Sequence, residues 1–257
     1  MDYIKLKEKW TAEENAHFQG WDFSRLSENW KESPLKWDYV KIVREYLKSD
    51  DLLLDMGTGG GEILLTIKHP YHLTYVTESY PPNVELCKKT LAPLGIHVSQ
   101  VYYGEYNEDL PFDDAMFDVV INRHESFDMS EVNRILKPGG YFITQQVGCE
   151  NYLKLKRAVM PEYKFPLSDF TLENNISIIK NNGFDILFQD ECFPERHVSD
   201  VGAVVYYLKA VPWEIADFSV ERYFPRLIEL HEHIKSNGFF ENTGHRFIII
   251  AQKKQIK

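Results

Sequence analysis

The chain has 257 residues, of which 44% are hydrophobic and 14% aromatic, so it can form one large α/β domain with an elaboration or two small domains. No apolar run reaches the ~18 residues that a membrane-spanning helix needs, and residues 1–10 carry mixed charge without an apolar signal core. A formal net charge of −10 disfavours nucleic acid as a partner, because an acidic chain repels polyphosphate at long range. The small basic cluster of Lys154, Lys156 and Arg157 is interpreted as a solvated helix face.

Cysteine and histidine usage argues against two further classes of site. The three cysteines, Cys87, Cys149 and Cys192, are far apart and form no CxxC pair, which indicates neither a disulfide framework nor an iron–sulfur cluster. The nine histidines include no HExxH motif, so we expect no metal. These features favour a cytoplasmic protein without a membrane partner, and they predict no particular oligomeric state.

The first 48 residues are expected to form a helical cap. Residues 1–35 are rich in tryptophan and charge, and they predict one or two helices that break at Ser33-Pro34. Residues 36–48 carry apolar side chains at helical spacing, and they predict an amphipathic helix that leads into the first strand.

Short apolar strands then alternate with helices as far as residue 147. Strands are predicted at residues 52–56, 74–77, 98–102, 118–121 and 141–147, and helices at residues 60–68, 82–91 and 129–136. This alternation is typical of βαβ crossovers and of a parallel sheet that helices cover on both faces.

The pattern is less regular after residue 147. It predicts a helix at residues 172–181, a strand at 184–188, helices at 201–208 and 220–235, and a last strand at 247–251. We therefore expect an α/β fold with a doubly wound, mainly parallel seven-stranded sheet. Residues 1–48 would form the cap and residues 49–257 the domain, with a helical insertion at about residues 194–244. We expect the domain and this insertion to form one compact body.

A glycine turn follows the first predicted strand, in the run from Asp55 to Glu62. Such a turn brings bare backbone N–H groups close to a ligand, which suits a dinucleotide or S-adenosylmethionine. The dinucleotide fingerprint G-x-G-x-x-G, counted from Gly57, needs a third glycine at position 62, where this chain has a carboxylate that would repel a pyrophosphate. The run fits Asp-x-Gly-x-Gly-x-Gly instead, and the alternative is a glycine-rich turn without a ligand.

The run resembles the first motif of class I S-adenosylmethionine-dependent methyltransferases, of the type 11-like kind. Later segments resemble the same family: Gly104-Glu105-Tyr106 with Leu110-Pro111-Phe112, Phe117 to Asn122, and Arg134 to Gly140. The resemblance implies the Rossmann-like methyltransferase fold, S-adenosylmethionine as cofactor, Glu78 on the ribose hydroxyls, Glu105 on the adenine amino group and Tyr106 against the adenine face. It gives as cofactor-binding residues Asp55, Gly57, Thr58, Gly59, Gly61, Glu78, Ser79, Glu105, Tyr106 and Asn122.

Candidate catalytic residues follow the fourth strand, in the segment Asn122-Arg123-His124-Glu125. The Asn-Pro-Pro-Tyr motif of adenine-directed amino-methyltransferases is absent. We interpret His124 as a general base or substrate-orienting group, with Glu125 or Arg123 orienting it or binding a polar substrate group. The alternative is that Arg123 and Glu125 form an ion pair that fixes the loop, while His124 only contacts the cofactor. Gln145 and Gln146 rank second, since buried amides can equally satisfy loop backbone.

Aromatic side chains are the last candidates for the site. Trp21, Trp30, Tyr206, Tyr207 and Trp213 could wall off a pocket from water, although ordinary packing of amphipathic helices explains each of them as well. We expect direct in-line methyl transfer to a small-molecule substrate, with RNA or protein methylation, or non-catalytic cofactor binding, as the alternatives.

Overall fold

A computed structural model describes residues 2–18, 23–102, 109–164 and 170–255. Within them the chain forms two compact units, each assembled from three separate segments. We call them the large unit (Lys36–Gly148, Asp169–Cys192 and Arg246–Lys257) and the small unit (Met1–Leu35, Cys149–Ser168 and Phe193–His245). Among the described residues, every helix is too short or too polar to span a lipid bilayer.

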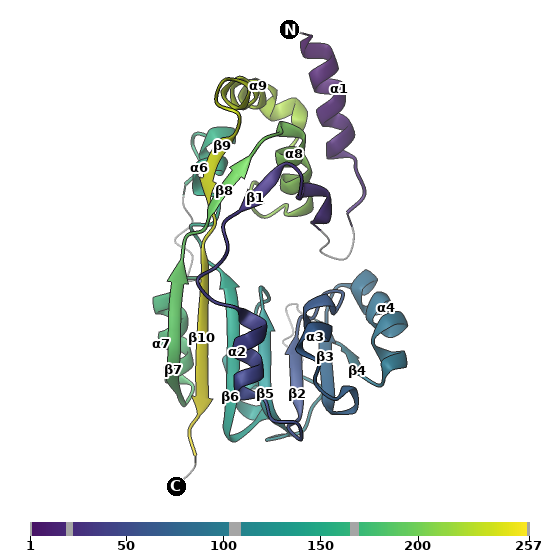
Figure 1. The fold of residues 1–257 in the computed structure, drawn as a ribbon, viewed down its shortest axis with the longest axis vertical. Coiled ribbons are helices and arrows are strands. Elements are labelled where there is room, and N and C mark those ends of the chain that lie inside the picture. Colours follow the sequence, from purple (N-terminus) through teal and green to yellow (C-terminus); the bar gives the residue numbers. More distant parts are fainter. Residues whose placement is uncertain (1, 19–22, 103–108, 165–169, 256–257) are drawn as a thin grey trace. The chain divides into compact units, whose positions relative to one another are not determined.

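The large unit is built on a seven-stranded sheet (Figure 1). In spatial order the strands are β4 (His97–Gln100), β3 (Thr74–Glu78), β2 (Leu53–Met56), β5 (Phe117–Arg123), β6 (Leu136–Val147), β10 (Arg246–Lys253) and β7 (Phe184–Cys192). Strand β10 pairs antiparallel with β6 and β7, and the remaining pairs are parallel. The structure thus confirms the mainly parallel, doubly wound fold that the sequence predicts.

Helices cover both faces of this sheet. Successive side chains of a strand point to opposite faces, so Leu53 packs in one apolar core and Leu54 in the other. Helices α2 (Tyr39–Tyr46), α3 (Glu62–Ile67) and α4 (Pro81–Thr90) contribute to the first core, and α5 (Met129–Ile135) and α7 (Leu172–Asn181) to the second. Short 3-10 turns at Tyr71–Leu73 and Ala92–Leu94 precede β3 and β4. The central strands β2 and β5 are buried on both faces and mostly apolar, whereas the edge strands β4 and β7 are partly exposed.

The small unit combines a three-stranded antiparallel sheet with helices. The sheet has the order β1 (Trp30–Glu32), β8 (Glu195–Val198) and β9 (Phe240–Thr243). The helices are α1 (Tyr3–Glu14), the 3-10 turn Ser24–Leu26, α6 (Leu153–Val159), α8 (Val201–Ala210) and α9 (Val220–Asn237). Its core contains the aromatic rings of Trp30, Tyr152 and Tyr207, whose centroids lie 4.9 to 5.3 Å apart.

The small unit differs from the sequence expectation in its strands and its composition. Strands β1, β8 and β9 have only three or four residues each and were not predicted, because their partners are distant in sequence, as Trp30 and Val198 are. The N-terminal segment, residues 149–168 and the insertion together form one compact unit. Helix α2 belongs to the large unit.

The interpretation of Lys156 as part of a solvated helix face is wrong. Lys156 is only 4% exposed, and its Nζ atom lies 2.5 Å from Oε2 of Glu214. The other oxygen of Glu214 accepts hydrogen bonds from Asn151 Nδ2 at 3.3 Å and from the Tyr207 hydroxyl at 3.0 Å. A buried lysine needs such a partner, and this one lies in a different segment of the chain.

Candidate active site

The predicted glycine turn lies at the carboxyl end of β2. Gly57, Gly59 and Gly61 have φ of +70°, +64° and +85°, a region that side chains with a Cβ rarely adopt. A Cβ on Gly57 would clash with the side chain of Glu125, and one on Gly61 would lie 2.7 Å from Cδ1 of Leu91. A Cβ on Gly59 would meet nothing within 4 Å. The turn is therefore closely packed at both ends and open in its middle, where a ligand can approach the backbone.

Glu78 joins the end of β3 to this turn. It is 3% exposed, and its Oε2 accepts a hydrogen bond of 2.8 Å from the Gly59 N–H. Its Oε1 accepts hydrogen bonds of 2.9 Å from the N–H groups of Ser79 and Tyr80. A carboxylate has about four acceptor positions, so these three donors orient Glu78 and leave capacity for a ligand hydroxyl. This geometry fits the ribose contact that the resemblance implies.

Asp55 is a buried carboxylate at the next-to-last residue of β2, close to the glycine turn. Burial raises the pKa of Asp55 to about 7, and the charge of Glu78 adds to this, while the Thr58 hydroxyl and Arg123 lower it. A cationic ligand would offset this desolvation, whereas a pyrophosphate would add to the repulsion. The electrostatics of the turn therefore favour a cationic ligand over a dinucleotide.

Asn122 is completely buried at the end of β5. Its Nδ2 donates to the Met56 carbonyl at 3.4 Å, and its Oδ1 accepts from the Thr144 hydroxyl at 3.0 Å and from Gln146 Nε2. Gln146 also donates to the Glu125 carbonyl at 3.0 Å. The Asn122 side chain therefore ties β2, β5 and β6 together, and Gln146 fixes the loop backbone.

His124 is exposed, with a left-handed φ of +61°. Its backbone N–H donates to the Gln145 carbonyl at 2.8 Å, and its Nε2 lies 3.1 Å from Gln145 Nε2. Gln145 Oε1 accepts from the indole N–H of Trp37 at 2.8 Å, which assigns the amide orientation and makes Gln145 Nε2 a donor. His124 Nε2 is then the acceptor and Nδ1 carries the proton. This arrangement presents His124 as a donor that orients a group, rather than as a base at Nε2.

Glu125 and Arg123 flank His124. Glu125 lies over Gly57, and its Oε1 accepts from the N–H and the hydroxyl of Ser126 at 3.0 and 3.1 Å. Burial raises the pKa of Glu125 and the charge of Glu78 adds to it, while the Ser126 hydrogen bonds lower it. The positive charge of Arg123 acts on Asp55 and on the Tyr39 hydroxyl.

The structure brings most of the predicted residues together. Parallel register places Met56 beside Thr77 of β3 and Asn122 of β5, so the three strands end at one edge. At this edge lie Asp55, Gly57, Thr58, Gly59, Gly61, Glu78, Ser79, Asn122, Arg123, His124 and Glu125. Glu105, Tyr106 and Trp21 lie outside the described residues.

Three of the aromatic residues proposed for the site pack in the core of the small unit instead. Trp30, Tyr206 and Tyr207 are less than 10% exposed in the core of the small unit, and Trp213 is 67% exposed.

In the large unit, Arg134 donates to the carbonyls of Leu110 and Phe112 at 2.9 and 2.7 Å and pairs with Glu131 and Asp114, so it holds the Leu-Pro-Phe segment.

Sequence reasoning missed three residues of this edge. Trp37 precedes α2 and orients Gln145. Tyr39 looked like part of an apolar helical stripe, yet its buried hydroxyl has no hydrogen-bond partner among the described residues. Asn83 in α4 is completely buried, with both amide atoms unpartnered in the described structure. The signal for Asn83 was an amide at the stripe position one turn before Cys87, whose Sγ lies 3.1 Å from the Gly59 carbonyl.

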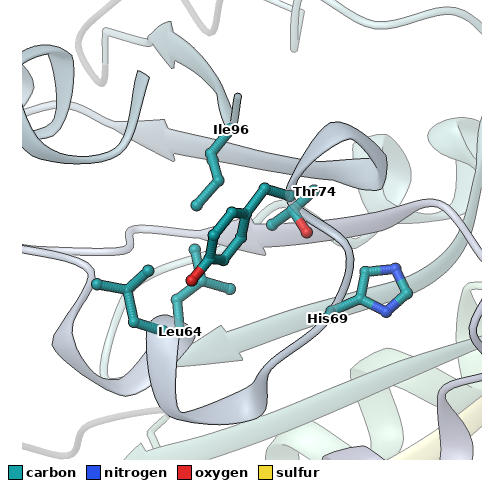
Figure 2. A pocket seen from close by; sticks show the side chains of 6 residues that line it. Leu64, His69, Thr74 and Ile96 are labelled. Carbon is teal, nitrogen blue, oxygen red and sulfur yellow. The ribbon is translucent and has the colours of Figure 1, made fainter. Parts of the chain in front are cut away.

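A hollow elsewhere in the large unit is not the site. Figure 2 shows it with Leu64, His69, Thr74 and Ile96 labelled among the lining residues. Thr74 is the first residue of β3, so the hollow lies at the amino end of that strand. Ligands of open α/β sheets bind at the carboxyl ends, where the glycine turn is.

The segment that carries most of the site residues is similar to a known protein family and to curated proteins. A family model described as a methyltransferase domain matches residues 54–144. The phthiotriol/phenolphthiotriol dimycocerosates methyltransferase of Mycobacterium tuberculosis (strain ATCC 25618 / H37Rv) is 37% identical over 99 residues, 35% of this chain and 35% of that protein. Its counterpart from Mycobacterium bovis (strain ATCC BAA-935 / AF2122/97) has the same identity and coverage. The chain spans about a third of the length of these curated relatives.

Solved structures share the fold over most of the chain. The YcgJ protein from Bacillus subtilis has a TM-score of 0.56 at 16% identity, covering 85% of this chain and 99% of that one. A protein from Bacillus halodurans C-125, assigned as a methyltransferase, has a TM-score of 0.55 at 15% identity, with coverages of 85% and 99%. At these identities the likeness concerns the fold alone.

Proposed function

We propose that the chain transfers a methyl group from S-adenosylmethionine to a small-molecule acceptor, on the premise that residues 54–144 match a family model described as a methyltransferase domain. The observation that carries the proposal is the carboxylate-lined glycine turn, in which Glu78 is fixed by the Gly59 N–H and Asp55 is buried. S-adenosylmethionine is the cofactor that a methyltransferase domain implies. Its sulfonium and ammonium groups suit these carboxylates.

Different residues at the turn suit different parts of the ligand. The open middle of the turn at Gly59 admits the ligand to the backbone. Glu78 offers its remaining acceptor capacity to a ribose hydroxyl, and Asp55 and Glu125 favour the cationic end of the ligand. Ligand charge would lower the free energy of these buried carboxylates in their ionised form.

When bound, S-adenosylmethionine supplies a methyl group on a positively charged sulfur. The protein then has to align an acceptor atom in line with that methyl group and exclude water. His124 stands at the end of β5, oriented by Gln145 and Trp37, with Nδ1–H as its donor. We assign it the role of orienting a polar acceptor group, with Arg123 supplying positive charge beside it.

Small-molecule acceptors are supported by two observations. The curated relatives are named for phthiotriol and phenolphthiotriol dimycocerosates, which are neither nucleic acids nor proteins. The chain carries a net charge of −10, which opposes binding of polyphosphate. Because the match to the family model ends at residue 144, we assign the choice of acceptor to residues outside the matched segment.

Calorimetry tests the cofactor half of the proposal. Wild-type protein should bind S-adenosylmethionine and S-adenosylhomocysteine at submillimolar concentration or better, and should not bind NAD. Glu78→Ala should weaken both by at least about tenfold, because a hydrogen bond to a charged group is lost. Glu85→Ala removes an exposed carboxylate from α4 and should leave affinity unchanged. Failure of wild-type protein to bind either ligand, or binding of NAD instead, would contradict the proposal.

Turnover tests the transfer half. Formation of S-adenosylhomocysteine should require a small-molecule fraction and not RNA or protein. His124→Asn should abolish that turnover while leaving cofactor affinity within about twofold. Binding without turnover on any acceptor class would instead indicate a cofactor-binding protein, and wild-type turnover in His124→Asn would remove His124 from the reaction.

A further inference from the structure

The Tyr39 hydroxyl is buried without a hydrogen-bond partner among the described residues. Tyr39 is the first residue of α2, and the helix begins there because Asp38 caps it by accepting from the Lys41 N–H at 3.0 Å. Buried hydroxyls in folded proteins nearly always have a partner, since an unpaired one costs free energy. A hydroxyl without a partner among the described residues therefore indicates a partner outside them, and a bound ligand supplies one.

The charges around Tyr39 place its hydroxyl at the candidate active site. Asp55 at the end of β2 and Arg123 at the end of β5 are the two groups whose charges act on it. Val43, one turn further along α2, packs in the same apolar core as the sheet residues Leu53 and Ile121. Helix α2 thus rests on the sheet and holds Tyr39 at the edge where β2 and β5 end.

Tyr39 is a hydrogen-bond donor at neutral pH. Burial raises the pKa of Tyr39 well above its ordinary value and the charge of Asp55 adds to this, while Arg123 lowers it. The proton therefore stays on the phenol, which can donate to an anionic group.

S-adenosylmethionine has one anionic group, its α-carboxylate, and few groups of the site are suited to bind an anion. Asp55, Glu78 and Glu125 are suited to the sulfonium, the ammonium and the ribose hydroxyls of S-adenosylmethionine, but they repel its α-carboxylate. Arg123 is the positive group that acts on both Asp55 and Tyr39. The Thr58 hydroxyl acts as a donor towards Asp55, whereas the Tyr39 hydroxyl is a buried donor that lacks a partner among the described residues.

We propose that the Tyr39 hydroxyl donates a hydrogen bond to the α-carboxylate of the bound cofactor, and so selects ligands that carry an amino-acid tail. This rests on the proposed function, because it assumes S-adenosylmethionine as the ligand. It also explains why a polar atom is retained at a helix position that otherwise faces the apolar core.

Tyr39→Phe removes only the oxygen, and two ligands report on it separately. S-adenosylhomocysteine carries the amino-acid tail, and 5′-methylthioadenosine lacks it. Calorimetry should show about ten- to hundredfold weaker binding of S-adenosylhomocysteine to the variant, as for loss of a hydrogen bond to a charged group, and unchanged binding of 5′-methylthioadenosine. Tyr46→Phe, at the last residue of the same helix, is the matched control and should change neither affinity.

Stability gives a second readout. Because the ligand-free protein buries this hydroxyl unpaired, Tyr39→Phe should unfold at the same temperature as wild type or higher, while S-adenosylhomocysteine should raise its melting temperature less than it raises that of wild type. Equal affinity of variant and wild type for S-adenosylhomocysteine would overturn the inference, as would equal losses for both ligands. Failure of wild-type protein to bind S-adenosylhomocysteine would overturn the proposed function itself.

Discussion

The Glu214 network of the small unit and the glycine-turn edge of the large unit differ in how their buried polar groups are compensated. In the small unit, the Glu214 carboxylate has Lys156, Asn151 and Tyr207 as partners, so its burial is compensated by the fold itself. In the large unit, the Tyr39 hydroxyl and both amide atoms of Asn83 are buried without partners among the described residues. A compensated network stabilises the ligand-free protein, whereas orphaned groups destabilise it until a ligand binds.

This difference predicts that the same kind of substitution changes the unfolding free energy in opposite directions at the two places. Removing one member of the Glu214 network should lower stability, because it leaves a buried charge alone. Removing an orphaned or uncompensated polar group from the glycine-turn edge should raise the stability of the ligand-free protein. Measured unfolding free energies of such variants therefore test the comparison directly.

The largest effect is expected for Lys156→Met. The substitution leaves Glu214 buried without its cation, which costs about 3 to 5 kcal/mol when one partner of a buried pair is removed. Urea unfolding of the variant and wild type measures the loss. Lys154→Met is the matched control, since Lys154 pairs with Glu241 on the surface and such pairs contribute little. A loss at Lys156 no larger than the loss at Lys154 would contradict the contrast between the two units.

Asp55→Asn should stabilise the ligand-free protein in a pH-dependent way. The folded-state pKa of Asp55 is raised to about 7 from an ordinary value of 3.8, so the folded protein binds this proton more tightly than the unfolded chain. Its contribution to stability is fully present below pH 3.8 and is lost as the pH rises towards 7. The asparagine variant does not undergo this loss.

The difference between Asp55→Asn and wild type should therefore grow with pH. It should be small near pH 4 and should reach up to about 4 kcal/mol above pH 7, at about 1.36 kcal/mol for each pKa unit. Urea unfolding at several pH values without ligand measures it. A difference that stays constant from pH 5 to pH 8 would show that Asp55 is not the uncompensated carboxylate described here.

The centre of the large unit's sheet could be predicted from sequence because its strands are buried on both faces. Residues 53–56 are buried throughout, so they form an apolar run that stands out from its neighbours. The glycine turn was also predicted from the sequence, and in the structure Gly57, Gly59 and Gly61 all have positive φ, which glycine adopts without strain.

What could not be predicted depends on contacts between distant segments. Strand β1 pairs with β8 through Trp30 and Val198, and no local pattern marks such short strands. Lys156 looked like a surface residue because Glu214, which compensates its charge, lies far along the chain. Tyr39 shared its helical spacing with core residues, and only the buried oxygen distinguishes it from a phenylalanine.

The smallest effect is expected at Asn83. Helix α4 packs one stripe against the glycine turn, with Leu91 contacting Gly61 and the Cys87 Sγ lying 3.1 Å from the Gly59 carbonyl. Asn83 lies one turn before Cys87 on this stripe, and both of its amide atoms are buried without a partner among the described residues. Asn83→Leu replaces the unpaired amide by an apolar side chain of similar size, and should raise the unfolding free energy of the ligand-free protein by about 1 kcal/mol.

Asn175→Leu in α7 is the matched control for that substitution. Asn175 is equally buried, but its Nδ2 donates to the Thr171 carbonyl at 2.8 Å. Leucine there should lower the unfolding free energy by about 1 kcal/mol, because this side-chain hydrogen bond is lost while the Thr171 carbonyl keeps the Asn175 N–H as a donor. Opposite signs for the two asparagines in urea unfolding would show that compensation, and not burial alone, distinguishes the edge of the glycine turn. Destabilisation of both variants by similar amounts would mean that Asn83 has a partner in the folded protein, and the contrast would then rest on Asp55 and Tyr39.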